Sequence, residues 1–98
     1  MRMALAGLLL LAACAAPAPR GPFFFDCGAA GRLSVSYPDD RSMIARLGGQ
    51  EARLTLQTSG SGARYGGAGR EVWEHQGEAL VTWGEGAAPF TCRMMASP

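Results

Sequence analysis

Ser61 and His75 are the two side chains whose types suit a nucleophile and its general base. They lie fourteen residues apart (75 minus 61), a spacing that a β-hairpin can bring together. Nucleophilic catalysis also needs a third group that orients the base, and no acid is indicated for that role. Nothing around Ser61 resembles the sharp turn that exposes a catalytic serine. We therefore do not expect this chain to be an enzyme.

Two further patterns also have simple structural explanations. Asp39 and Asp40 are adjacent carboxylates, but they follow Pro38 and are typical of a solvated turn. Residues 60–65 begin like a dinucleotide-binding fingerprint, yet Tyr65 stands where the third glycine belongs. No strand–helix–strand unit surrounds them. We expect no cofactor.

The first residues have the pattern of an export signal. Arg2 precedes ten apolar residues at 4–13, whereas a membrane-spanning helix needs about 20. The sequence LAAC that ends at Cys14 is typical of a bacterial lipobox, in which the cysteine is diacylated and becomes the new N-terminus. We predict a lipoprotein signal peptide over residues 1–14. The alternative is an ordinary signal peptide that is cut nearby.

The residues after Cys14 predict how the protein is held in the envelope. Ala15 follows the cysteine, and the absence of aspartate there favours the outer membrane, facing the periplasm. Residues 15–21 are rich in alanine and proline, which favour an extended tether over packing. The folded domain is then expected over residues 22–98.

Cys27 and Cys92 remain once Cys14 carries lipid. In an exported chain they meet an oxidising compartment, so we predict one disulfide between the beginning and the end of the domain. A zinc site wants about four cysteine or histidine ligands, and His75 is the only histidine. We expect no metal.

The domain itself reads as short segments with alternating apolar and polar residues, separated by turns rich in glycine, proline and aspartate. This pattern is typical of antiparallel strands with one buried face, and no segment has a helical period. The net charge of +1 gives no field that would attract nucleic acid. We predict an all-β domain, an eight-stranded sandwich or small closed barrel, with strands near 22–27, 32–37, 42–47, 51–57, Tyr65, 70–76, 78–83 and 88–93.

Four motifs together resemble one family. They are FDCG near the start of the domain, SGARY at 61–65, WEHQGEA at 73–79 and FTC at 90–92, all behind a lipobox. This set is similar to the membrane-bound inhibitors of C-type lysozyme and their periplasmic relatives. The resemblance implies an eight-stranded antiparallel β-barrel closed by a disulfide. It also implies a protein partner, C-type lysozyme, whose inhibition protects bacterial peptidoglycan.

The resemblance further implies which residues bind. Family members insert a serine-bearing loop into the lysozyme active-site cleft, and the matching residue here is Ser61, with Gly62 allowing close backbone approach and Tyr65 completing the motif. A family lysine two residues after the tryptophan corresponds to His75, and this chain contains no lysine. The resemblance thus implies a lysozyme-binding set of Ser61, Gly62, Tyr65 and His75.

Other interpretations stay open at this point. Ser61 suits an ordinary hairpin, Tyr65 and Trp73 suit the core or its rim, and alternation places His75 inward if Trp73 is buried. A second function is an envelope lipoprotein with a structural or assembly role and no lysozyme inhibition. The sequence leaves open whether the barrel forms a homodimer.

Overall fold

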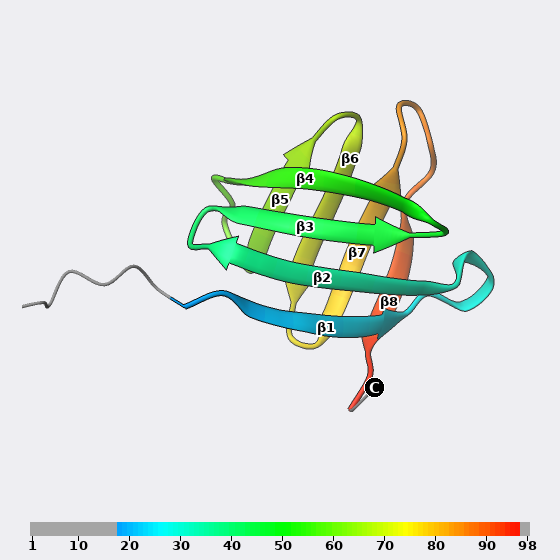
Figure 1. Cartoon of the computed structure of the whole chain (residues 1–98). Helices are drawn as coiled ribbons and strands as arrows, with labels where there is room; N and C mark the ends of the chain where they lie inside the picture. Colours follow the sequence, from blue (N-terminus) through cyan, green and yellow to red (C-terminus); the bar gives the residue numbers. More distant parts are fainter. Residues whose placement is uncertain (1–17, 97–98) are drawn as a thin grey trace, which may run out of the picture.

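The structure is a computed structural model that describes residues 18–96, and in it eight antiparallel strands close into a barrel (Figure 1). Each strand pairs with the next, and β8 pairs with β1. The strands β1–β4 cross in front of β5–β8 in Figure 1, so the barrel has two walls. The predicted eight-stranded barrel is confirmed. Its strands are β1 (Arg20–Asp26), β2 (Arg32–Asp39), β3 (Ser42–Leu47), β4 (Gln50–Gln57), β5 (Ala63–Gly67), β6 (Arg70–His75), β7 (Glu78–Trp83) and β8 (Phe90–Met94), with one turn of 3-10 helix, η1 (Gly28–Ala30), between β1 and β2.

Three hairpins are closed by two-residue turns whose central residues both have positive φ. Such turns match the natural twist of antiparallel strands and fix their register. They join β3 to β4, β5 to β6 and β6 to β7, through Gly48–Gly49 (φ 59° and 82°), Ala68–Gly69 (54° and 76°) and Gln76–Gly77 (51° and 82°).

Alternate residues of the strands fill the barrel. On β2, Leu33, Val35 and Tyr37 are buried, while the residues between them are only partly covered. This is the period of two that the sequence predicted. The largest side chains that are almost completely buried are Phe25, Leu33, Val35, Met43, Leu54, Val72, Val81 and Cys92.

A disulfide between Cys27, the residue after β1, and Cys92 of β8 forms as predicted. The two cysteines are 65 residues apart in the sequence. Closing a loop of that length restricts the unfolded chain and stabilises the fold by about 4 kcal/mol in the chain-entropy model. The contribution is large for a domain with a core this small.

The first and last strands differ from their predicted bounds by two residues at their starts. β1 begins at Arg20 rather than Pro22, because Arg20 pairs with Tyr37 beyond an irregularity in the register. β8 begins at Phe90 rather than Ala88. The preceding Pro89 lacks the N–H that a strand pairing requires.

A polar cluster lies inside one end of the barrel. The Tyr37 hydroxyl donates a hydrogen bond to Glu74 Oε2, and the Arg20 guanidinium lies 4.6 Å from the centre of the Tyr37 ring. Burial raises the pKa of Glu74, while the Tyr37 hydrogen bond and the Arg20 charge oppose that rise. Burial and the neighbouring Glu74 likewise hold the pKa of Tyr37 well above its usual value. Glu74 thus places an inward-facing carboxyl group at this end of the barrel. Its backbone carbonyl lies next to residue 62.

Candidate functional site

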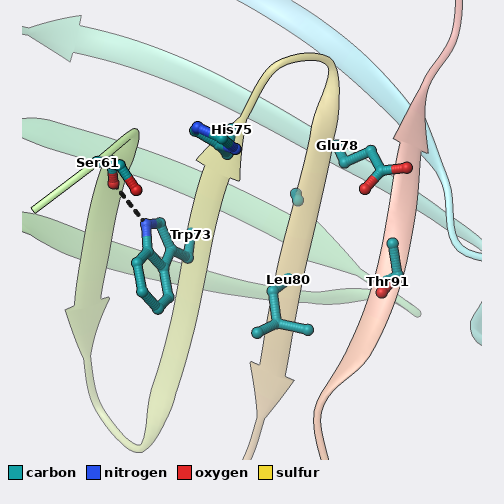
Figure 2. Close-up of a pocket in the computed structure, with 7 residues that line it drawn as sticks. Ser61, Trp73, His75, Glu78, Leu80 and Thr91 are labelled. Atoms are coloured by element: carbon teal, nitrogen blue, oxygen red, sulfur yellow. Dashed lines mark hydrogen bonds between the residues drawn. The ribbon is translucent and has the colours of Figure 1, made fainter. Parts of the chain in front are cut away.

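The loop between β4 and β5, residues 58–62, is held against β6 by a hydrogen bond to the Ser61 carbonyl group. The Ser61 carbonyl oxygen accepts from Trp73 Nε1 at 2.9 Å (Figure 2). It also accepts from Ser59 Oγ, within the loop, at 2.6 Å. The Ser61 residue itself is exposed. The loop therefore presents Ser61 to solvent from a backbone that is fixed in place.

Gly62 is seated directly on β6. Its φ is +65°, and a Cβ at this position would collide with the Glu74 carbonyl oxygen and lie 3.2 Å from the His75 Cβ. An L side chain would meet both a steric and a conformational obstacle. Gly60, two residues earlier, has neither a positive φ nor any atom within 4 Å of such a Cβ. Only the second of these two glycines is needed for the close approach.

A groove of about 170 Å³ opens beside the loop on the outer face of the barrel. The strand register explains its composition, because Trp73 lies opposite Leu80 and Leu80 lies opposite Thr91. Leu80 is 42% exposed and gives the groove an apolar surface. Figure 2 shows the groove lining, which includes Ser61, Trp73, His75, Glu78, Leu80 and Thr91.

His75 is exposed at the end of β6 and lines this groove. The predicted alternation is correct, because Trp73 and His75 share a face, but that face is the outer one. The inward-facing neighbours are Val72, which is completely buried, and Glu74. The condition under which His75 would point inward, a buried Trp73, is not met, and His75 faces outward together with Trp73. Within residues 18–96, no hydrogen bond joins His75 to Ser61.

Tyr65 lies in the barrel core and is 6% exposed. Its ring centre is 5.7 Å from that of Tyr37, and burial raises its pKa. It pairs with Val72 across β5 and β6 and so belongs to the support beneath the loop. Of the four residues implied by the family motif, Ser61 and His75 line one groove. Gly62 lies at the contact of the loop with β6, and Tyr65 lies behind in the core.

Sequence reasoning missed several residues of this surface. Leu80 and Thr91 join the groove through strand pairing, and Arg64 lies opposite Trp73 on the other side. The Arg64 Cζ is 4.1 Å from the centre of the Trp73 ring. The dipeptide Gln76–Gly77 was the available signal, because a two-residue turn there sets His75 against Glu78 and Trp73 against Leu80.

Comparisons with known proteins agree with this architecture. A family model described as "Membrane-bound lysozyme-inhibitor of c-type lysozyme" matches residues 25–89. Proteins named "Lipoprotein LprI" from Mycobacterium bovis and Mycobacterium tuberculosis are 40% identical over 55 residues, which is 56% of this chain. The match spans only 27% of the length of those relatives. No solved structure gives a significant match.

Proposed function

The chain belongs to the family of membrane-bound inhibitors of C-type lysozyme, and from this premise we propose that it inhibits such an enzyme by inserting the Ser61 loop into the active-site cleft. The observation that carries the proposal is the way in which β6 holds the loop. Trp73 fixes the Ser61 carbonyl while the residue itself stays exposed beside an open groove. The proposed role is binding rather than catalysis.

The chemistry of the target suits such a loop. A lysozyme cleaves its glycan between two carboxyl groups that face each other across a cleft, one protonated and one ionised. The Ser61 hydroxyl can replace a substrate hydroxyl as a hydrogen-bond donor to those groups. The loop holds no glycosidic bond, so the enzyme is occupied without turnover. A loop whose backbone is already fixed also loses less conformational entropy on binding.

The direct test is an inhibition assay with the mature chain from residue 15 onward, which contains the complete barrel. We expect it to slow a C-type lysozyme on bacterial cell walls at micromolar concentration. The same protein should leave an unrelated glycan hydrolase unaffected. Full lysozyme activity at a large excess of the protein would contradict the proposal and favour a structural role in the envelope.

We propose that lipid on Cys14 anchors the protein in the envelope, at the outer membrane facing the periplasm. The family description and the lipoprotein name of the mycobacterial relatives support an envelope location. Cys14 and the tether up to residue 17 lie outside the described residues, and within 18–96 no helix has the length and apolarity to cross a bilayer. Cys14→Ala should move the protein from the membrane fraction to the soluble fraction, and unchanged fractionation would overturn the anchor.

A further inference from the structure

We propose that Arg64 is the cation that this protein presents to the carboxyl groups of the lysozyme cleft, and that Glu71 moderates its charge. The inference rests on the proposed function, because it assigns a residue of the same surface. All nine basic residues of the chain are arginine, so no lysine is available near Ser61. An arginine side chain keeps its charge throughout the physiological pH range.

Arg64 and the Ser61 loop both contact the indole ring of Trp73. The Trp73 ring nitrogen donates to the Ser61 carbonyl at 2.9 Å, and the Arg64 Cζ lies 4.1 Å from the centre of the same ring. A guanidinium over an indole face is held by a cation–π attraction. Its position relative to the loop is therefore set before a partner arrives, which lowers the cost of ordering the side chain on binding.

The Arg64 guanidinium is incompletely satisfied within the barrel. Its Nε lies 2.8 Å from Glu71 Oε2, but the N–H does not meet hydrogen-bond geometry, and Nε has no other partner within residues 18–96. The two side chains are 33% and 37% exposed, and ion pairs at such positions contribute little stability. A guanidinium has five N–H donors in a planar fork, so it can donate to a second carboxylate while it stays paired with the first.

Other arginines are less suited to this role. Arg93 pairs with Glu78 and is 75% exposed, so its side chain is not fixed by an aromatic ring in the way that Arg64 is. Arg70 packs over Trp83 and donates to Gln50. Arg64 alone, among the arginines of the described part of the chain, shares an aromatic partner with the Ser61 loop.

The test measures the dissociation constant for a C-type lysozyme at about 50 and 200 mM salt. Arg64→Gln should weaken binding roughly tenfold or more, the size expected for a hydrogen bond to a charged group, and should flatten the salt dependence. Arg64→Lys should recover part of the loss. Glu71→Gln should tighten binding, because it removes the competing carboxylate. The Arg46–Glu51 pair joins directly opposite residues of β3 and β4, with an Nε–Oε1 distance of 2.7 Å. Arg46→Gln also removes one arginine from an arginine–glutamate pair, but away from the Ser61 loop, so it is the control and should bind normally.

The outcomes separate this inference from the proposed function. If the unaltered protein does not bind lysozyme, the proposed function fails and takes this inference with it. If the unaltered protein binds and Arg64→Gln binds equally well, the inference alone is overturned. Equal weakening by Arg64→Gln and Glu71→Gln would also overturn it, because the pair would then be a structural support. Thermal unfolding of each variant distinguishes such support from a lost contact.

Discussion

The backbone carbonyl and the side-chain hydroxyl of Ser61 have different roles. Its carbonyl oxygen accepts from Trp73 and Ser59 and fixes the loop, while its hydroxyl forms no hydrogen bond within residues 18–96. The proposed contact thus uses a group that the fold itself does not need. Removing the hydroxyl should alter binding and leave the barrel intact.

Ser61→Ala should weaken lysozyme binding by about 1–3 kcal/mol, because it leaves polar groups of the enzyme cleft desolvated and unpaired. Its thermal midpoint should stay close to that of the unaltered protein. Ser59→Ala removes a hydrogen bond that only supports the loop, so it should weaken binding less. Inhibition constants measured side by side decide this, and equal losses from both variants would mean that the wrong serine has been assigned.

At the residue scale, the sequence predicted the type of site better than its full composition. Ser61 and Gly62 followed from the motif, and His75 from its place after Trp73. The sequence alone did not show which face of β6 is the outer one, because Trp73 is apolar enough for either. Arg64 and Leu80 were missed because their roles depend on cross-strand neighbours.

At the scale of elements, the site depends on how one loop rests on one strand. The loop of residues 58–62 approaches β6 so closely that its last residue has no room for a side chain. The hairpin of β6 and β7 then supplies the groove beside it. Binding and loop conformation should therefore change together when this contact is disturbed.

Gly62→Ala should shift or loosen the loop and reduce both stability and inhibition. The left-handed conformation alone costs about 1–2 kcal/mol for a residue with a Cβ, before the collision with the Glu74 carbonyl is counted. Gly60→Ala is the matched control, since its Cβ would meet nothing within 4 Å. Chemical denaturation and inhibition assays on both variants test this. A Gly62→Ala protein that inhibits as well as Gly60→Ala would show that the close contact of residue 62 with β6 is not needed for inhibition.

The strands themselves were predictable because alternation and turn chemistry agree along the chain. Val35 between Ser34 and Ser36 shows the period of two, and Gly48–Gly49 shows the turn that a tight hairpin demands. The irregular register at β1 was not predictable, because Pro22 reads as a boundary rather than as an interior residue. Local patterns predict elements, whereas register needs the partner strand.

On the scale of the whole molecule, the barrel partly buries the carboxyl group of Glu74, and burying its charged form costs free energy of folding. Glu74 faces inward, accepts from Tyr37, and has its pKa raised mainly by burial. A raised pKa in the folded state favours folding while the group is protonated. That contribution is present below the ordinary value of 4.5 and is lost as pH rises through the higher value of the folded protein.

Glu74→Gln keeps an acceptor for the Tyr37 hydroxyl and removes the charge. Its thermal midpoint relative to the unaltered protein should therefore rise progressively as pH is raised from about 4 to about 8. Glu85→Gln makes the same substitution at an exposed position and serves as the control. If the difference in thermal midpoint between Glu74→Gln and the unaltered protein stays constant over this range, burial does not raise the pKa of Glu74.

The central claim is that the barrel blocks the lysozyme cleft itself, and competition with a cleft ligand tests it most directly. The measurement is calorimetric binding of the mature protein to lysozyme at increasing concentrations of a short chitin oligosaccharide that fills the cleft. If the Ser61 loop occupies the cleft, the apparent dissociation constant should rise in proportion to the oligosaccharide concentration. An affinity for lysozyme that does not change when the cleft is saturated with oligosaccharide would contradict the claim, because it would place the barrel elsewhere on the enzyme.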